Sequence, residues 1–184
     1  NPDIRFGLEI VDITQLVAQS GFRVFTNVVS SGGQVRGINA KSLGDYSRSQ
    51  IDELTAFVNQ FDAKGLAYLA LTSEGEERSS FAKFLSEETR SRILAEMNAE
   101  PGDLLLFVAD QQDVVFESLG MLREELGSRL GFCDQDVLGF AWIIDFPLFN
   151  WNADEDRWDP SHHLFTSPMM EDVHYLDTDP GKAR

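Results

Sequence analysis

The chain has 184 residues, of which 42% are hydrophobic, and its 15 Lys and Arg against 31 Asp and Glu give a formal net charge of −16. A chain of this length and hydrophobic content can bury the core of one domain or of one and a half domains. No segment approaches the ~20 consecutive apolar residues that a membrane-spanning helix needs. Binding to nucleic acid by counterion release needs clustered Lys and Arg, so we expect this surface to bind RNA weakly or not at all.

Cys133 is the only cysteine, so the chain can form neither an internal disulfide nor a cysteine-based zinc cluster. Its neighbours Asp134 and Asp136 disfavour a thiolate, which indicates an inert structural thiol and not a nucleophile. The sequence also lacks a charged start followed by an apolar stretch and a small-residue cleavage site. We therefore expect a cytoplasmic protein.

The first forty residues predict a helix and a hairpin. Asp12 can cap a short helix that ends at Gly21. Residues 22–29 and 34–40 are rich in β-branched side chains and flank Ser30-Ser31-Gly32-Gly33, so we expect two strands joined by a turn. The glycine pair does not predict a phosphate loop, because no helix and no Lys-Ser/Thr pair follow it.

The middle of the chain alternates helix and strand. A capping box, Ser47-x-x-Gln50, opens a helix that ends at Gly65, and residues 66–71 form a short apolar strand. Lys64 lies in the last turn of that helix, where the helix dipole alone explains a basic residue.

Residues 72–80 are polar and acidic, which predicts a mobile loop. Residues 81–85 and 87–98 are typical of helix, and Ser86 is a candidate cap between them. Residues 104–109, LLLFVA, are fully apolar, which predicts the central strand.

The clearest helix is predicted over residues 113–130. Its apolar positions are spaced by four, three, four and four residues: Val115, Leu119, Leu122, Leu126 and Leu130. This leucine stripe predicts docking on a sheet and not a partner-binding zipper. The element order favours an α+β fold, a two-layer domain with an antiparallel four-stranded sheet and helices on one face, with a mixed or parallel sheet as the alternative.

Residues 140–151 and 158–166 predict two more strands, joined by residues 152–157 into a hairpin. Successive strand side chains point to opposite faces, so His162 and His163 would not both face one ligand. Adjacent strand positions also do not suit a zinc pair. Spacing alone favours two ordinary half-buried histidines at a strand end.

The hairpin carries more apolar surface than two strands can cover, which predicts that it belongs to a larger sheet and that the chain is a fragment. The acidic run at residues 154–156 sits in an exposed turn. An acid/base pair needs environments that push two pKa values apart, so a two-carboxylate hydrolase is disfavoured.

Four blocks, in order, resemble bacterial aspartyl-tRNA synthetase, a class II aminoacyl-tRNA synthetase. NPDIRFG at residues 1–7 resembles the run that leaves the catalytic domain, and AKGLAY at residues 63–68 resembles a signature of the inserted domain. DFPLF with SHHLFTSP resembles the DFP-x-F and HHPFT-P segments, and TDPGKAR is similar as well. Two positions depart from the family pattern: Leu164 replaces its usual proline, which frees the backbone after the histidines and restores an amide donor, and Asn150 replaces a common acidic residue.

The resemblance implies an inserted GAD domain, shared with the B subunit of the aspartyl/glutamyl-tRNA amidotransferase. The resemblance divides the chain into three parts. Residues 1–20 form an exit from the catalytic domain with a connecting helix, and residues 21–132 form the GAD-like domain. Residues 133–184 form an incomplete return into the catalytic domain. The hairpin would then belong to the class II catalytic sheet.

The resemblance also implies a parent aspartate–tRNA ligase that activates L-aspartate with ATP and Mg²⁺ and transfers it to tRNA(Asp), with tRNA(Asn) as an open second acceptor. The parent would be a homodimer. By resemblance, His162 and His163 would help to hold aspartate and ATP. The segment lacks motifs 1, 2 and 3, so we expect it to be inactive alone and to bind no cofactor. The alternative is a non-catalytic GAD module that contacts tRNA or a neighbouring protein.

Overall fold

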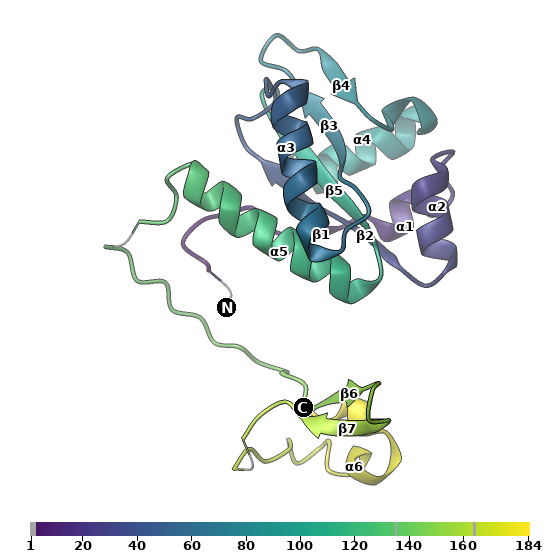
Figure 1. Ribbon diagram of the computed structural model, residues 1–184, viewed down its shortest axis with the longest axis vertical. Helices are drawn as coiled ribbons and strands as arrows, with labels where there is room; N and C mark the ends of the chain where they lie inside the picture. The colour runs from purple at the N-terminus through teal and green to yellow at the C-terminus, as the bar shows by residue number, and fades with distance from the viewer. Residues whose placement is uncertain (1–2, 135, 164) are drawn as a thin grey trace. The chain divides into compact units, whose positions relative to one another are not determined.

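The protein is described here by a computed structural model that covers residues 3–134, 136–163 and 165–184. It consists of two compact units, a larger unit, Asn1–Gly139, and a smaller unit, Phe140–Arg184 (Figure 1). Among the described helices, none is both long and apolar enough to cross a membrane.

The larger unit is built on a five-stranded antiparallel sheet in the order β1-β2-β5-β3-β4. The strands are β1 (Val11–Asp12), β2 (Gln34–Ala40), β3 (Ala67–Leu71), β4 (Glu77–Ser79) and β5 (Leu104–Asp110). The central position predicted for the apolar run at residues 104–109 is confirmed, because β5 pairs with β2 on one side and β3 on the other.

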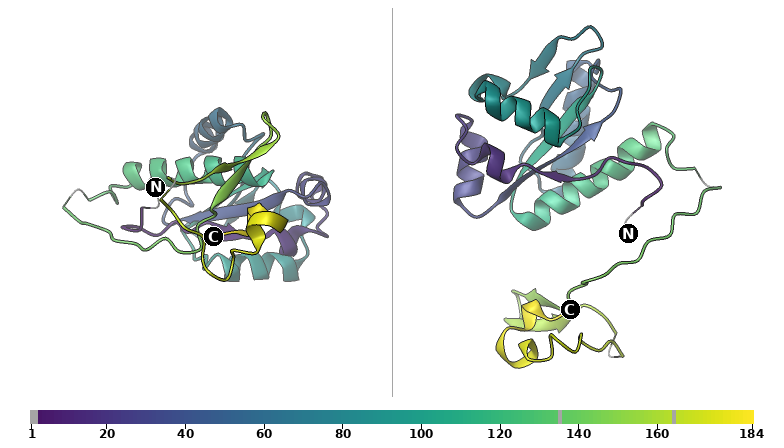
Figure 2. Two further views of the ribbon diagram at one scale, coloured as in Figure 1. Left: turned by 90° about the horizontal axis from the view of Figure 1, so that it is seen from below. Right: turned by 180° about the vertical axis from the view of Figure 1, so that it is seen from behind.

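Helices cover both faces of this sheet (Figure 2). α3 (Arg48–Val58), the 3₁₀ turn η1 (Asn59–Phe61) and α5 (Gln112–Arg129) share one face, and α1 (Thr14–Val17), α2 (Arg23–Ser30), the 3₁₀ turn η2 (Ala82–Phe84) and α4 (Glu87–Glu96) share the other. Along β5, Leu104, Leu106 and Val108 enter the first core, and Leu105 and Phe107 enter the second. A strand that is apolar on both faces must be covered twice.

The predicted α+β class and antiparallel pairing are therefore confirmed. The predicted detail is corrected in two respects, because the sheet has five strands and not four, and helices lie on both faces and not on one.

The strand predicted over residues 22–29 is wrong, because this segment forms helix α2. Phe22, Phe25 and Val29 fall at helical spacing and pack into the core that lies on the α4 side of the sheet. The β-branched residues of this stretch suggested a strand, but tertiary packing overrides that weak preference. The predicted turn is the end of the helix, where Gly33 N donates to Val28 O at 2.9 Å.

The loop predicted over residues 72–80 contains strand β4, which pairs with β3 and forms one edge of the sheet. Ser79 Oγ donates to Tyr68 O at 2.9 Å and accepts from Phe81 N at 3.1 Å. A strand of three polar residues shows no alternation of apolar side chains, so its sequence carried no strand signal.

The helix predicted from Asp12 to Gly21 is shorter than expected, because α1 covers Thr14–Val17; its N-cap is Ile13, which makes no side-chain cap, although Asp12 Oδ1 accepts from Thr14 N at 2.9 Å. The other two predicted helix caps are confirmed. Ser47 and Gln50 form a reciprocal capping box at the start of α3, and Ser86 Oγ accepts from Thr89 N at the start of α4. In α5, four residues of the predicted stripe, Val115, Leu119, Leu122 and Leu126, are fully buried. The position predicted for Lys64, in the last turn of a helix, is wrong, because α3 and η1 end before it, at Val58 and Phe61. Lys64 instead makes an ion pair with Asp110 at 3.2 Å.

The smaller unit contains a hairpin of β6 (Phe149–Asn152) and β7 (Arg157–Pro160), followed by α6 (Tyr175–Thr178) and the 3₁₀ turn η3 (Pro180–Lys182). Both predicted strands are shorter than expected: residues 140–148 are not in a strand, and the second strand ends at Pro160. Trp142 is 96% exposed and Phe140 is 85% exposed. The apolar pattern of this stretch is typical of a strand, but a strand forms only where a neighbour accepts its backbone hydrogen bonds.

Candidate functional site

The histidine pair lies just beyond the hairpin of the smaller unit. The hairpin ends at the pair Phe149 and Pro160, and Ser161 N then donates to Leu148 O at 2.9 Å. His162 and His163 follow this bend and belong to no strand, and both are exposed. The expectation that strand alternation would turn them to opposite faces therefore does not apply. Leu164, the departure from the family pattern, lies outside the described residues.

Each imidazole ring contacts one aromatic ring. The centroids of His162 and Phe146 are 4.4 Å apart at an interplanar angle of 55°, and those of His163 and Phe165 are 4.7 Å apart and stacked at 26°. Within the part of the chain that the structure describes, neither imidazole makes a hydrogen bond or ion pair to protein. Both rings can therefore offer nitrogen atoms to a ligand.

Arg184 gathers three acidic residues of the same unit. Its Nη1 lies 2.9 Å from Asp145 Oδ1, its Nη2 lies 3.2 Å from Glu171 Oε1, and its Nε lies 2.9 Å from Asp172 Oδ2. Asp172 is buried, and the hydrogen bond from Arg184 holds the pKa of this carboxyl below its usual value. Leu148 N donates to Ala183 O at 2.8 Å, so residues 183–184 are also tied to the segment before β6.

The acidic turn of the hairpin is organised by hydrogen bonds within the turn. Asn152 Oδ1 accepts from the backbone N–H groups of Asp154 and Glu155, and Arg157 pairs with Glu155 and Asp159. These carboxylates are solvated and paired with one arginine, so the geometry does not set two of them apart as an acid and a base. Among the described residues, no group of three or more His, Cys, Asp or Glu could hold a metal ion.

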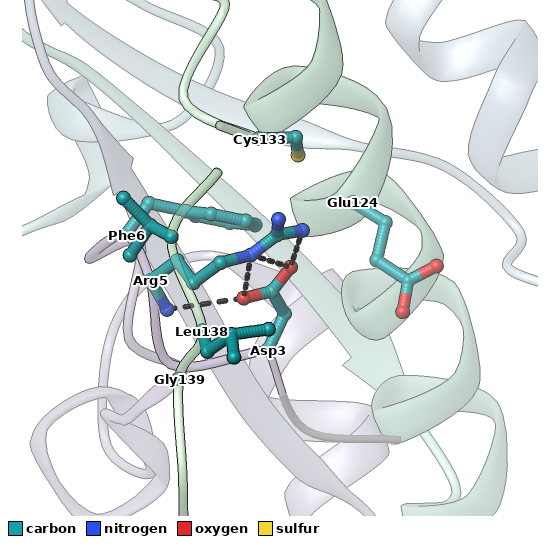
Figure 3. Close-up of a pocket in the computed structure, with 8 residues that line it drawn as sticks. Asp3, Arg5, Phe6, Glu124, Cys133, Leu138 and Gly139 are labelled. Carbon is teal, nitrogen blue, oxygen red and sulfur yellow. Dashed lines mark hydrogen bonds and ion pairs between the residues drawn. The ribbon is translucent and has the colours of Figure 1, made fainter. Parts of the chain in front are cut away.

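A second candidate lies in the larger unit, in a hollow where the N-terminal segment meets Cys133 and residues 137–139 (Figure 3). Arg5 binds the Asp3 carboxylate through Nη2 at 2.6 Å and Nε at 3.0 Å. These hydrogen bonds hold the pKa of Asp3 at about 2. Cys133 lines the same hollow as a half-buried free thiol.

Charge compensation in this hollow indicates a structural joint. The Arg5 guanidinium is shared between the Asp3 carboxylate and the backbone oxygen of Asp134. A Cβ atom on Gly139 would come within 3.1 Å of Ile4 and 3.2 Å of Arg5, so the two segments approach closely there. The hollow therefore fastens two segments of the larger unit through the paired Arg5 side chain.

Arg123 on α5 fixes the same N-terminal segment. Its guanidinium donates to the backbone oxygens of Asp3, Phe6, Gly7 and Leu8, and its Cζ atom lies 4.5 Å from the centre of the Phe6 ring. This role of Arg123 was not predicted from the sequence. The available signal was one arginine between Leu122 and Leu126 on a helix face that is otherwise apolar.

The comparisons with known proteins agree with this arrangement. The GAD domain family model matches residues 25–119, from α2 into α5. That range covers more than half of the 184 residues, and the chain belongs to the GAD domain family.

Curated relatives match the chain well beyond the GAD domain. It is 50% identical over 183 residues to the aspartate–tRNA ligase of Ruminiclostridium cellulolyticum, covering 100% of this chain and 31% of that protein. It is 55% identical over 172 residues to the aspartate–tRNA(Asp/Asn) ligase of Symbiobacterium thermophilum, covering 94% of this chain and 29% of that protein. The corresponding ligase of Geotalea uraniireducens is 50% identical over all 184 residues and 31% of its length. The chain thus spans about three tenths of the relatives' length.

The resemblance drawn from four short blocks is therefore confirmed over the whole chain. The matched residues include the GAD domain and also the smaller unit, which the GAD match does not reach.

Proposed function

We propose that this chain is part of a class II aspartate–tRNA ligase, which activates L-aspartate with ATP and transfers it to tRNA. The observation that carries the proposal is identity of 50% across the full chain to aspartate–tRNA ligases. A free-standing GAD module would account for residues 25–119 but not for the segments on either side.

The proposed role of His162 and His163 is to hold aspartate and ATP through hydrogen bonds. Both rings are exposed and are supported by aromatic neighbours on one side. An imidazole N–H can donate to a carboxylate or a phosphate oxygen, and a protonated ring adds charge to that contact.

Mg²⁺ prefers clustered oxygen ligands, and the described residues form no such cluster. We assign Mg²⁺ binding, and the arginines that neutralise phosphate charge, to other parts of the parent protein. The chemistry of adenylate formation consists mainly of positioning and charge stabilisation, so a segment without those groups is expected to be inactive. The parent is proposed to be a cytoplasmic homodimer.

Aspartate-dependent exchange between ATP and pyrophosphate tests this proposal. The assay is run on the 184-residue chain and on the complete gene product in parallel. We expect exchange only from the complete protein, and we expect His162→Ala and His163→Ala in that protein to raise the KM for aspartate or ATP. No exchange from the complete protein would reject the proposal.

The transfer step is assayed with tRNA(Asp) and tRNA(Asn) separately, because relatives named for one or for both tRNAs match at similar identity. The second candidate is a non-catalytic interaction module, which the GAD match favours. Under that alternative, neither protein catalyses exchange, and the complete protein still binds tRNA or a protein partner.

A further inference from the structure

Asp145 holds an unusual backbone conformation directly before the residue that contacts His162. Its φ angle is +55°, in the left-handed region that side chains other than glycine rarely adopt. The next residue, Phe146, has its ring against His162. The unusual conformation at Asp145 therefore lies in the backbone that leads directly into the residue whose ring contacts His162.

Arg184 binds the side chain of Asp145. Its Nη1 contacts Asp145 Oδ1 at 2.9 Å, and its other side is anchored to the buried Asp172, which accepts both Arg184 Nε at 2.9 Å and Arg184 N at 3.1 Å. A guanidinium is planar and rigid, so an arginine fixed at one edge presents its other edge in one place.

The Phe146 ring has little other support. It is 44% exposed, so no surrounding core dictates its position. Two contacts lie close to Phe146 along the chain: the side-chain ion pair between Asp145 and Arg184, and the backbone hydrogen bond from Leu148 N to Ala183 O. Phe146 lies between these two contacts in the sequence, and both contacts lead to residues 183–184.

We propose that Asp145 and Arg184 are positioning residues that place Phe146 against the His162 imidazole and so orient its nitrogen atoms toward the carboxylate or phosphate of a bound substrate. This inference rests on the proposed function, in which His162 binds aspartate or ATP. The two residues touch no substrate themselves and act through Phe146.

Histidine NMR on the 184-residue chain tests the positioning directly. The chain has three histidines, so the ring signals can be assigned individually. The Phe146 ring is expected to displace the His162 signals through its ring current, and Phe146→Leu gives the reference without that displacement. We expect Asp145→Ala and Asp145→Gly to lose most of the displacement, and Asp145→Asn to retain it, because asparagine tolerates a positive φ and keeps an acceptor for Arg184.

Asp156→Ala is the matched control. Asp156 also has a positive φ, +50°, and belongs to the same unit, but it lies in the hairpin turn and is not one of the carboxylates that pair with Arg184. His162 signals should stay at their wild-type positions in this variant. Unchanged His162 signals in both Asp145→Ala and Asp145→Gly would overturn the proposal.

The indole signals of Trp151 and Trp158, which pack edge to face in the hairpin, report whether the unit is folded. If they also move in Asp145→Ala, Arg184→Lys decides the question, since lysine keeps the charge but cannot span Asp145 and Asp172 together. Loss of the displacement then supports the positioning, and a wild-type His162 spectrum rejects it.

The same variants in the complete protein separate this proposal from the proposed function. Misplacing a binding group by about 1 Å can cost up to ~100-fold in rate, so kcat/KM for aspartate-dependent exchange is expected to fall by up to this factor in Asp145→Ala and to recover in Asp145→Asn. Normal exchange by His162→Ala would reject the ligand role of His162, whereas the spectra would still decide whether Asp145 and Arg184 position it.

Discussion

At the scale of single residues, Asp103 closes the turn that leads into β5. Its buried carboxylate accepts from Lys41 Nζ at 2.8 Å, Glu100 N at 2.9 Å and Asn39 Nδ2 at 3.1 Å. Burial by itself raises the pKa of Asp103, but these hydrogen bonds together outweigh it, and the pKa lies below its ordinary value. One side chain thus joins the end of β2 to the start of β5.

The pKa of Asp103 predicts a pH-dependent contribution to stability. A folded-state pKa below that of the unfolded chain means that the ionised carboxylate stabilises the fold at neutral pH, and that this contribution is lost as the pH falls through the folded pKa. We expect Asp103→Asn to lower the free energy of unfolding by about 2 kcal/mol at pH 7 and the difference from wild type to shrink below about pH 4. Urea unfolding at a series of pH values measures this.

Asp52→Asn is the control for that experiment. Asp52 makes an exposed ion pair with Arg48 one turn along α3, and such a pair contributes at most about 0.5 kcal/mol. A difference for Asp103→Asn that stays constant from neutral to acid pH would contradict the assigned role of the carboxylate.

Two glycines of α5 provide a second test at this scale. A Cβ on Gly120 would meet no atom within 4 Å, whereas a Cβ on Gly127 would lie 2.6 Å from the Phe6 ring. Gly120→Ala should stabilise the protein by about 0.5 to 1 kcal/mol through helix propensity. Gly127→Ala makes the same gain in helix propensity but displaces the Phe6 ring. We therefore expect the free energy of unfolding of the Gly127→Ala variant to be about 1 to 3 kcal/mol lower than that of the Gly120→Ala variant. Equal thermal midpoints for the two variants would argue against close packing of Phe6 on the helix.

At the scale of elements, α5 both covers the sheet and holds the N-terminal segment. Its apolar stripe lies in the core, and Arg123 on the neighbouring face binds four backbone oxygens of residues 3–8. This segment belongs to no helix or strand, so its backbone groups lack regular partners, and a multidentate donor on a rigid helix can fix it.

Replacing this arginine should release the segment. We expect Arg123→Gln to lower the free energy of unfolding by about 2 kcal/mol and to expose the bond after Arg5 to trypsin under native conditions. Mass spectrometry of a short digest measures that cleavage. Arg129→Gln is the matched control on the same helix, because Arg129 pairs only with Glu125 among the described residues. Equal cleavage after Arg5 in the two variants would contradict the proposed role of Arg123 in fixing residues 3–8.

At the scale of the whole molecule, the two units differ in how much apolar surface they bury. The larger unit has two cores, one on each face of its sheet, whereas the buried apolar side chains of the smaller unit are Leu148 and Ala183 among those described. A small unit with so little core is expected to be marginally stable by itself.

All three tryptophans, Trp142, Trp151 and Trp158, lie in the smaller unit, so their fluorescence follows that unit alone. Far-UV ellipticity follows mainly the helices of the larger unit. If the two units unfold separately, the unit with the smaller core unfolds first. We therefore expect the fluorescence transition to occur at a lower urea concentration than the ellipticity transition. Trp142→Phe removes the most exposed indole and should leave the fluorescence midpoint unchanged. Coincident midpoints by the two probes would reject separate unfolding.

The histidine site could be predicted from the sequence only as a pair of residues. His162 and His163 were singled out by their resemblance to a family segment, but their position beyond the hairpin and their aromatic neighbours depend on where β7 ends. The residues that support the pair were not predicted, since Arg184 and Asp145 are 39 positions apart and neither belongs to a periodic pattern.

The sequence by itself determined the features that depend on neighbours along the chain: the caps at Ser47 and Ser86, the apolar stripe of α5 and the apolar strand β5. Side chains within four residues of one another set these features, so the pattern of residues contains them. Tertiary structure alone decided that residues 23–30 are a helix, that β4 completes an edge of the sheet, and that Arg123 and Arg184 anchor distant segments. Each of these depends on a partner that is remote in sequence and becomes a neighbour only when the chain folds.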